Sequence, residues 1–404
     1  MEKEKLLIVG AGMAATRLVE ELVATAPDRY AIQLIGEEPR FPYNRVLLSS
    51  ALTGEVALDD IALKPREWWR ANGVETITGK RVARIDTDSR RVFLDDGAQA
   101  SYSKLVLATG SYAMRLPIPG SDLPGVHTFR DMSDVEALSR LGSGGARVLV
   151  IGGGLLGLEA AYGLVKRGAR VTLAHVMDRL MERQLDHAGA ALLQRMIEEK
   201  GVEAMLRANA SRICGENAVE RVEFEDGRSI AVDAVVFAVG VRPNVELARA
   251  TGLSVNRGVR VDDGLAASHA DIFAIGECAE HRGQCYGLVE PAYEHARVLA
   301  ARLAGRDAAY PGSVVATNLK VSGVRVFSAG DFIAAEGDSE IICKDARLGV
   351  YRKLVIADDR LKGAILIGDA SGALAYLDLI RSGDSVAAIR DDLMFEAPQL
   401  KEAA

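Results

Sequence analysis

The sequence predicts an α/β protein in which two doubly wound parallel sheets are followed by a smaller C-terminal α+β domain. Two glycine fingerprints predict the doubly wound sheets, at residues 10–15 and 152–157, each between an apolar strand and a run of helix formers. After about residue 312 the pattern changes to three apolar runs, which we read as strands, and a helical run. The three strands are expected at 320–326, 349–356 and 361–367, and the helix at 374–382.

The chain length fits more than one domain. The sequence has 404 residues and 40 glycines, and the glycines concentrate at turns between apolar runs. The run Leu116–Gly120 contains two prolines and a glycine, which is typical of a boundary. We expect residues 1–113 and 241–311 to form the first doubly wound domain, 114–240 the second, and 312–404 the C-terminal domain.

The charge and the hydropathy pattern limit which partners and which cellular location we expect. The net charge is −7 and no long block of one sign occurs, so nucleic acid is not expected as a partner. The charged start, Met1–Lys5, leads directly into a strand and leaves no room for a signal peptide. No stretch has the length of a membrane span. We therefore expect a cytoplasmic enzyme that does not bind a membrane.

The four cysteines do not form a recognisable site. They are spread over the second half of the chain without a Cys-x-x-Cys pair, and we expect buried or unused thiols. The alternative makes Cys278 and Cys285 a redox or metal pair. Two thiols alone cannot complete an iron–sulfur or structural zinc site, so no metal is expected.

The first fingerprint predicts a dinucleotide site at the N-terminus. A strand over Lys5–Val9 leads into Gly10, Gly12 and Ala15, which open a helix through about Ala24. These small residues let the backbone approach a pyrophosphate, which the N-terminus of the helix would attract. The alternative, close strand–helix packing without a ligand, stays open for this motif alone.

Two charged residues follow at positions suited to the same ligand. The next strand, Tyr30–Ile35, ends beside Glu37, whose carboxylate can accept hydrogen bonds from both ribose hydroxyls. Arg45 lies in a turn at 41–50 and has a rigid fork of donors suited to a pyrophosphate. The alternative for Arg45 is an ordinary surface arginine.

The second fingerprint is complete and predicts a second dinucleotide. Gly152, Gly154 and Gly157 form the motif, with a helix expected from about Leu155 to Arg167, and a strand at 170–174 ends at His175. An NADH site often has a carboxylate at this position and an NADPH site an arginine, so His175 points neither way. The chain has no arginine cluster here, so NADH is favoured, with NADPH as the alternative.

The two halves read as structural repeats. Each has an inserted hairpin, with turns at 95–97 and 226–227, and each hairpin leads to a strand with a similar end. Those ends are Ala108-Thr109-Gly110 and Ala238-Val239-Gly240. A later strand, 271–275, is followed by Gly276 and Glu277 and can return to the first sheet, bringing Glu277 to a polyol chain. The alternative is a solvated glutamate.

With these pieces in order, the sequence resembles the FAD-dependent pyridine-nucleotide oxidoreductases of the glutathione-reductase class. Within that class it is similar to the N-terminal module of NAD(P)H-dependent nitrite reductase large subunits. The motifs that carry the resemblance are Pro42–Arg45 with Leu48 and Ser49, Ala108–Ser111, Gly152–Ala161, Leu180–Asp186, Gly240–Asn244, Gly276–Cys278, Gly287–Pro291, Tyr351–Leu354, and Gly368 with Asp369.

The resemblance implies roles for these residues. Gly10, Gly12 and Ala15 would bind the FAD pyrophosphate, and the second fingerprint that of NADH. Glu37 would bind the adenosine ribose, Arg45 would lie near the phosphates, and Glu277 would bind the ribityl chain. Glu159 would lie near the nicotinamide and the flavin. The remaining expected cofactor contacts are Ala108, Thr109, Gly110, His175, Gly240 and Pro291, the last at a helix N-terminus near the flavin's pyrimidine edge.

The resemblance also limits the chemistry. No cysteine precedes Cys214, which excludes the disulfide reductases and the cysteine-dependent peroxidases of the class. Ser50 stands where related ferredoxin reductases have a lysine, so a lysine–glutamate pair with Glu159 cannot form. Four scattered cysteines cannot build iron–sulfur and sirohaem centres. We therefore expect the chain to pass electrons from NADH through FAD to a protein acceptor.

The acceptor stays open. A catalytic subunit of nitrate or nitrite reductase is expected first, and rubredoxin or ferredoxin outside nitrogen metabolism is the alternative. A second alternative is a redox-sensing FAD- and NADH-binding protein with slow turnover. The C-terminal domain either covers the flavin's far face, where this class also forms homodimers, or packs without a redox role.

Overall fold

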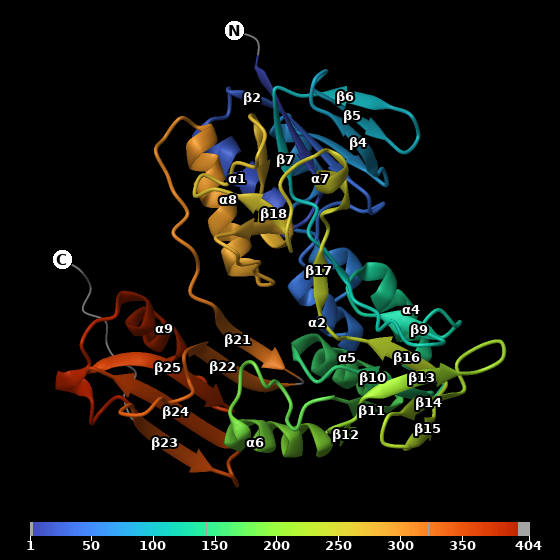
Figure 1. Ribbon diagram of the computed structural model, residues 1–404, viewed down its shortest axis with the longest axis vertical. Helices are drawn as coiled ribbons and strands as arrows, with labels where there is room; N and C mark the ends of the chain where they lie inside the picture. Colours follow the sequence, from blue (N-terminus) through green and yellow to red (C-terminus); the bar gives the residue numbers. More distant parts are fainter. Residues whose placement is uncertain (1–2, 143, 322, 395–404) are drawn as a thin grey trace. The chain divides into compact units, whose positions relative to one another are not determined.

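The computed structural model describes residues 3–142, 144–321 and 323–394, and the chain divides into two compact units. The first unit contains residues 1–48, 56–112 and 241–313. The second contains 49–55, 113–240 and 314–404. Each unit is described below by itself (Figure 1).

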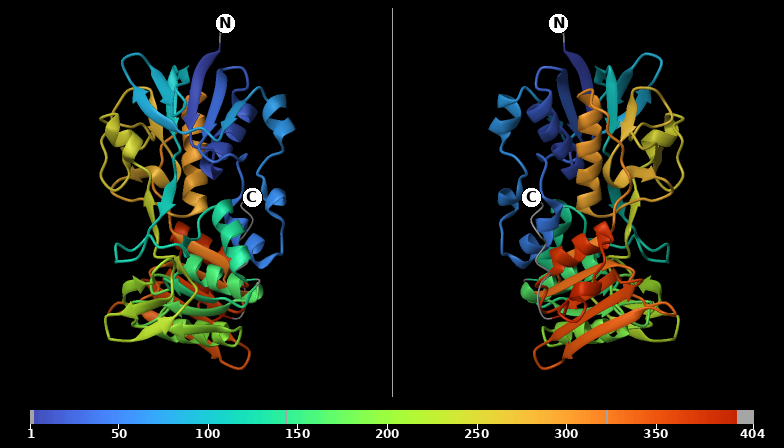
Figure 2. Two further views of the ribbon diagram at one scale, coloured as in Figure 1. Left: turned by 90° about the vertical axis from the view of Figure 1, so that its right-hand side faces the viewer. Right: turned by 90° about the vertical axis from the view of Figure 1, so that its left-hand side faces the viewer.

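A five-stranded parallel sheet organises the first unit, in the order β19-β7-β1-β2-β3. Helices α1 and α8 pack on one face, and the antiparallel sheet β4-β5-β6 packs on the other (Figure 2). The elements are β1 Glu4–Val9, α1 Met13–Thr25, β2 Tyr30–Gly36, β3 Glu75–Thr78, β4 Val82–Asp86, β5 Arg91–Leu94, β6 Gln99–Ser101, β7 Lys104–Leu107, β19 Ile272–Ala274 and α8 Val289–Leu303.

Alternation along β1 explains this layering. Leu6 and Ile8 belong to the cluster under α1 and α8, whereas Leu7 and Val9 belong to the cluster under β4-β5-β6. Successive side chains of a strand point to opposite faces, so an apolar run of this kind is buried on both sides. The predicted strand, fingerprint turn and helix at the N-terminus are confirmed.

Shorter elements complete the first unit. Strands β18 and β20 form a parallel pair, and β8 pairs with β17. The bounds are η1 Arg45–Leu47, η2 Leu58–Ile61, α3 Arg66–Ala71, β8 Ser111–Ala113, β17 Val241–Pro243, α7 Glu246–Ala250, β18 Val259–Val261, η3 Gly276–Cys278 and β20 Ala279–His281.

The second unit repeats the same plan. Its parallel sheet has the order β12-β11-β10-β16-β9, and an antiparallel sheet, β13-β14-β15, packs on one face through the cluster of Leu149, Ile151 and Val222. The elements are β9 Val126–Thr128, α4 Met132–Gly142, β10 Arg147–Ile151, α5 Leu155–Lys166, β11 Arg170–Ala174, α6 His187–Glu198, β12 Val202–Met205, β13 Ala210–Cys214, β14 Arg221–Phe224, β15 Ser229–Ala231 and β16 Ala234–Phe237.

Helix α2, Leu48–Thr53, groups with the second unit from Ser49 on, although its neighbours in sequence belong to the first. It packs along one face of α5. A Cβ on Gly163 would lie 2.6 Å from Leu52 Cδ2, so a glycine lets the two helices approach. Arg167 donates from Nε to Leu52 O at 2.7 Å and from Nη2 to Ala51 O at 3.0 Å, satisfying carbonyls at the end of α2.

The C-terminal residues of the second unit form a five-stranded antiparallel sheet, β21-β22-β25-β24-β23, covered on one face by α9. The elements are β21 Ala316–Val321, β22 Val324–Gly330, β23 Ser339–Asp345, β24 Val350–Ala357, β25 Arg360–Ile367, α9 Ala373–Ser382 and η4 Ala387–Ile389. The predicted strands at 349–356 and 361–367 and the closing helix are confirmed.

The prediction of one strand over 320–326 is wrong. These residues fall on two antiparallel strands, β21 and β22, with Gly323 between them at φ +75°. A glycine at positive φ reverses the chain without steric cost, so the apolar run folds back on itself.

Asp186 connects the C-terminal sheet to α6. Its Oδ1 accepts from Gly189 N at 2.9 Å, and its Oδ2 accepts from the Tyr351 hydroxyl at 2.6 Å. The ammonium group of buried Lys353 lies 3.5 Å from Asp186 Oδ2 and 2.5 Å from Glu340 Oε1. One carboxylate therefore caps a helix and neutralises a buried cation.

Candidate functional site

Both fingerprints place the N-terminus of a helix beside open space. Gly12 is the N-cap of α1 and Gly154 that of α5, and a glycine has no side chain that could accept a hydrogen bond from the first-turn N–H groups. Neither helix has an acidic residue in its first turn. A Cβ built on Gly12 or Gly154 would meet no atom within 4 Å. The first-turn N–H groups can therefore bind an anion.

The first glycine of each fingerprint packs against the end of a neighbouring strand. Gly10 has φ +109° and Gly152 has φ +122°, and a Cβ on either would overlap a carbonyl oxygen, of Ala108 or of Ala238 respectively. The backbones are also hydrogen-bonded, Ala108 N to Val9 O at 2.7 Å and Ala238 N to Ile151 O at 2.8 Å. The strand ends that the sequence paired as repeats lie at equivalent places in the two units.

The third position differs between the two fingerprints for a steric reason. A Cβ on Gly157 would overlap the carbonyl oxygen of Gly152, so only glycine fits there. Ala15 occupies the matching position in α1 and is fully buried without such a conflict.

Three predicted segments meet in the first unit. The Ser111 hydroxyl donates to Glu277 Oε2 at 2.6 Å. Thr109 Oγ1 donates to Asn244 O at 2.8 Å, and Asn244 Nδ2 donates to Thr109 O at 2.8 Å. Segment 108–111 is thereby linked to the segments after β17 and β19. Gly110 also joins this network, because its carbonyl accepts from Asn244 N at 2.9 Å.

Gly276, beside Glu277, is held by a histidine that sequence reasoning missed. Its backbone N–H donates to His295 Nδ1 at 3.2 Å, and its φ is +75°. His295 lies on α8, and burial lowers its pKa to about 4, so the neutral ring can accept this bond. A histidine two turns into a later helix gives no sequence signal for such a contact.

The end of β2 places two glutamates near Arg45. Glu37 is exposed, whereas Glu38 forms an ion pair with Arg45 and accepts from the Tyr43 hydroxyl at 2.7 Å. The Arg45 guanidinium also lies over the Tyr43 ring, 5.0 Å from its centre. Glu37 stays the predicted ribose ligand, and its neighbour Glu38, for which the sequence predicted no role of its own, orients the arginine.

Glu159 lies on α5 and receives a hydrogen bond from Ser49 of α2. Burial raises the pKa of Glu159 to about 7, and the Ser49 hydroxyl opposes that rise. The side chain is thus partly protonated near neutral pH. Glu159, Gly163 and Arg167 are spaced by four residues, so a single face of α5 makes all three contacts with α2.

His175 follows β11 and is almost fully buried. Its Nδ1 accepts from Gly153 N at 3.0 Å, and its Nε2 lies 3.0 Å from Glu182 Oε2. Both ring nitrogens are therefore engaged within the protein. Gly240, at the equivalent of Gly110, has φ +108°, and its carbonyl accepts from Met114 N at 2.9 Å.

Pro291 is the third residue of helix α8, which begins at Val289. The predicted helix start near 291–292 is thus two to three residues late. Pro291 is tolerated in a first turn because its missing N–H has no helical partner there.

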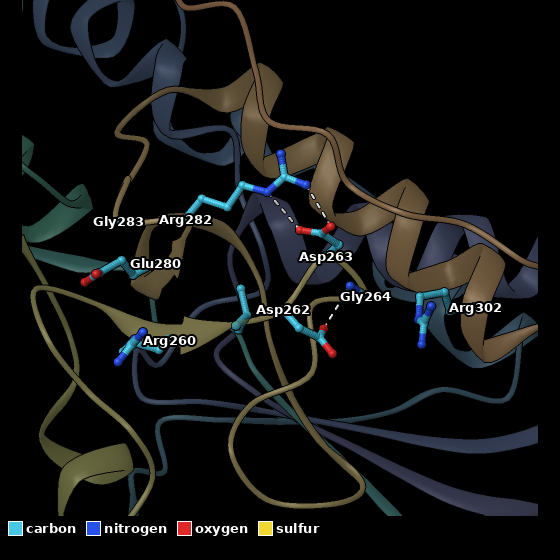
Figure 3. A pocket seen from close by; sticks show the side chains of 9 residues that line it. Arg260, Asp262, Asp263, Gly264, Glu280, Arg282, Gly283 and Arg302 are labelled. Carbon is cyan, nitrogen blue, oxygen red and sulfur yellow. Dashed lines mark hydrogen bonds and ion pairs between the residues drawn. The ribbon is translucent and has the colours of Figure 1, made fainter.

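A cavity of about 620 Å³ in the first unit contains none of the predicted site residues (Figure 3). Arg282 donates to both oxygens of Asp263, at 3.0 and 2.7 Å. This pairing, with His281 as a second donor, lowers the pKa of Asp263 to about 2. Asp262 accepts from Gly264 N at 2.8 Å. Charges of both signs line the cavity, so it does not favour an anionic dinucleotide.

Metal binding and membrane insertion can be judged for the described ranges, 3–142, 144–321 and 323–394. No three His, Cys, Asp or Glu side chains there gather as a metal site. No helix in the same ranges combines the length and apolar character needed to cross a membrane.

Comparison with known proteins identifies the family. The model of the pyridine nucleotide-disulphide oxidoreductases matches residues 4–298. The chain belongs to this family. A second model, the rubredoxin NAD+ reductase C-terminal domain, matches residues 316–384. This pyridine nucleotide-disulphide oxidoreductase therefore carries an additional C-terminal domain, as the sequence predicted.

Its relatives include two proteins of Bacillus subtilis strain 168. An NAD(P)H nitrite reductase is 44% identical over 94% of this chain and 48% of its own length. An assimilatory nitrate reductase electron transfer subunit is 42% identical over 94% of this chain and 49% of its own length. The chain spans about half the length of these curated relatives.

A solved structure supports the fold of this family member over most of its length. The NADH:rubredoxin oxidoreductase of Clostridium acetobutylicum superposes with a TM-score of 0.79 at 26% identity, covering 97% of this chain and 99% of the other. The predicted α/β fold and the predicted family resemblance are both confirmed.

Members of this family use FAD and NAD(P)H, and the residues present fit both groups. Each fingerprint offers an uncapped helix start beside open space, as a pyrophosphate requires. The stretch 42–50, in contrast, contains no cysteine. This member of the disulphide oxidoreductase family therefore has no thiol there for disulfide exchange.

Proposed function

We propose that this chain is a flavoprotein electron-transfer reductase that takes hydride from NADH onto FAD and passes electrons to a redox partner of nitrate or nitrite assimilation. The single observation that carries this proposal is the pair of matched, uncapped fingerprints in one chain of this family. The two Bacillus subtilis relatives favour the nitrogen-assimilation partner.

The proposal assigns FAD to residues 1–113 and 241–311. Gly10, Gly12 and Ala15 would hold its pyrophosphate, with Glu37 at the ribose and Arg45, oriented by Glu38, near the phosphates. Glu277, held by Ser111, would bind the ribityl chain, and segment 108–110 would lie against the ring. The N-terminus of α8 at Pro291 would favour negative charge at the pyrimidine edge.

The proposal assigns the nicotinamide nucleotide to residues 114–240. Gly152, Gly154 and Gly157 would bind its pyrophosphate, and His175 and Gly240 would line the same site. When bound, FAD supplies the hydride-accepting and electron-releasing chemistry. The side chains bind, orient and exclude water, so no general base is required. Residues 312–404 would serve as a cap or as an interface for the acceptor or a second copy.

Glu159 would lie beside the nicotinamide and the flavin. Because its raised pKa keeps part of the carboxyl neutral near pH 7, it places less negative charge at the hydride path than an exposed glutamate would. Substituting Glu159→Ala should slow reduction of the bound flavin by NADH in stopped flow. An unchanged rate would remove Glu159 from the site.

A second candidate is reduction of a rubredoxin or ferredoxin outside nitrogen metabolism. The C-terminal match to the rubredoxin NAD+ reductase domain and the likeness to the rubredoxin oxidoreductase favour it. Purified rubredoxin, ferredoxin and a nitrate or nitrite reductase catalytic subunit should be tested as acceptors under the same conditions. The acceptor reduced fastest at equal concentration identifies the partner class.

The central test is the flavin itself. The purified protein should be yellow, bind FAD and reduce an artificial dye rapidly with NADH. A colourless protein that binds no FAD would overturn the proposal, and flavin reduction followed by very slow dye turnover would indicate a redox sensor instead. We further propose a cytoplasmic location, which cell fractionation would test, and a homodimer, which sedimentation analysis would test.

A further inference from the structure

We propose that Glu182, held in place by His175, binds the adenine ribose of the nicotinamide nucleotide and selects NADH over NADPH. The inference rests on the proposed function, because it assumes that the second fingerprint binds this nucleotide. It assigns selectivity to a residue seven positions after the place where spacing along the sequence predicts it.

The ribose of a dinucleotide is bound at the carboxyl end of the second strand of its fold. In the second unit that strand is β11, and the residue after it is His175. The ring of His175 turns toward the fingerprint, where its Nδ1 accepts from Gly153 N. An imidazole that accepts at Nδ1 carries its proton on Nε2, so Nε2 donates to Glu182 Oε2 at 3.0 Å. No nitrogen of His175 is left for the ribose.

The loop after β11 returns Glu182 to this strand end. Met181 N donates to Gly153 O at 2.9 Å, so Gly153 is bonded on one side to the loop and on the other to His175. Leu180, Met181 and Leu185 are fully buried and anchor the loop. Met181 has φ +51°, a costly conformation for a bulky residue that persists only where surrounding contacts enforce it.

His175 orients the carboxylate of Glu182 but leaves hydrogen-bond acceptor sites on it for a ligand. The His175 bond occupies one lone pair of Oε2, and an ionised carboxylate has about four acceptor sites. The Glu182 side chain is 24% exposed, so it is accessible from solvent. Ribose hydroxyls can donate to these acceptor sites, whereas the 2′-phosphate of NADPH would meet a like charge.

The nearby arginines offset this charge only weakly. Arg179 donates to Asp178 Oδ1 at 3.1 Å and to Leu185 O at 3.3 Å. Arg183 is 87% exposed, and its Nε lies 4.0 Å from Glu182 Oε1. The loop therefore presents a fixed carboxylate and only a solvated cation.

The test uses ligands that lack the nicotinamide, so its outcome is independent of flavin reduction. Calorimetric titration of the FAD-loaded protein with ADP-ribose and with 2′-phospho-ADP-ribose should show at least roughly tenfold tighter binding of ADP-ribose, as expected for hydrogen bonds to a charged acceptor. Glu182→Gln keeps the bond from His175 but removes the charge. It should weaken ADP-ribose roughly tenfold and remove most of the preference.

Two further variants make the test specific. His175→Ala keeps the charge of Glu182 but leaves it unoriented, so it should also weaken ADP-ribose while 2′-phospho-ADP-ribose still binds less tightly than ADP-ribose. Glu203→Gln removes an exposed carboxylate from the neighbouring strand β12, where it is not paired with an arginine of the loop, and should leave both affinities within about twofold. Thermal unfolding midpoints close to that of the unaltered protein establish that each variant is folded.

Three results would overturn the inference: equal affinity of the unaltered protein for both ligands, unchanged affinities in Glu182→Gln, or loss of preference in Glu203→Gln instead. If ADP-ribose binds with the expected preference but NADH does not reduce the flavin, the proposed function fails and the ribose assignment stands.

Discussion

Replacing Glu159 with glutamine should make the stability of the protein less dependent on pH. The pKa of Glu159 is raised from 4.5 to about 7, chiefly by burial. Since the folded-state pKa exceeds the unfolded one, the stability linked to this group is fully present below about pH 4.5 and is lost as pH rises through about 7. The loss amounts to about 2 to 3 kcal/mol, the lower figure allowing for partial exposure.

Urea unfolding of the FAD-loaded protein, without nicotinamide nucleotide, measures this effect. Between about pH 5 and about pH 9, Glu159→Gln should gain about 2 kcal/mol relative to the unaltered protein. Ser49→Ala is the matched control, because loss of the hydroxyl that opposes the pKa rise should move the transition to higher pH. Identical pH profiles for the unaltered protein and Glu159→Gln would refute the reasoning.

Three further predictions concern packing. Gly157→Ala should destabilise the second unit by about 1 to 3 kcal/mol, because the added Cβ would overlap Gly152 O. Gly154→Ala, in contrast, should keep the stability and weaken NAD+ binding. Calorimetry of both variants separates the two effects. Asp186→Ala removes the cap of α6 and takes one partner from the buried Tyr351 hydroxyl and from Lys353. The urea midpoint should therefore fall by the equivalent of about 3 kcal/mol. A midpoint as high as that of Asp178→Ala would contradict the role of Asp186. Arg167→Ala should increase amide hydrogen exchange in residues 49–55, because two carbonyls of α2 lose their donor, and unchanged protection would show that Leu52 packing alone holds the helix.

The features that the sequence predicted well are local. Gly10 and Gly152 are fixed by the strand and helix on either side of them, and strand alternation at Leu6–Val9 follows from burial on two faces. Local rules also fix the helix start at Gly154. The hairpin at Gly323 was predictable in principle, because a serine–glycine pair between two apolar runs is a turn signal.

The features that the sequence did not predict depend on contacts between distant residues. Glu38 rather than Glu37 holds Arg45, and the choice between neighbours depends on the turn at Tyr43. Glu182 reaches the end of β11 only because Met181 bonds to Gly153. His295 reaches Gly276 from a different helix. No spacing rule connects these pairs, since each is set by how two elements pack.

The interleaving of the two units has a consequence for synthesis on the ribosome. The first unit cannot complete its sheet until β19 has emerged, and its helix α8 ends only at Leu303. The parallel sheet of the second unit is complete once Phe237 has emerged, earlier than that of the first. The chain therefore begins one unit, finishes the sheet of the other, and only then returns. During this interval the sheet that contains β1, β2 and β7 has an unpaired edge at β7. Chaperone binding or aggregation would compete most with folding in this period.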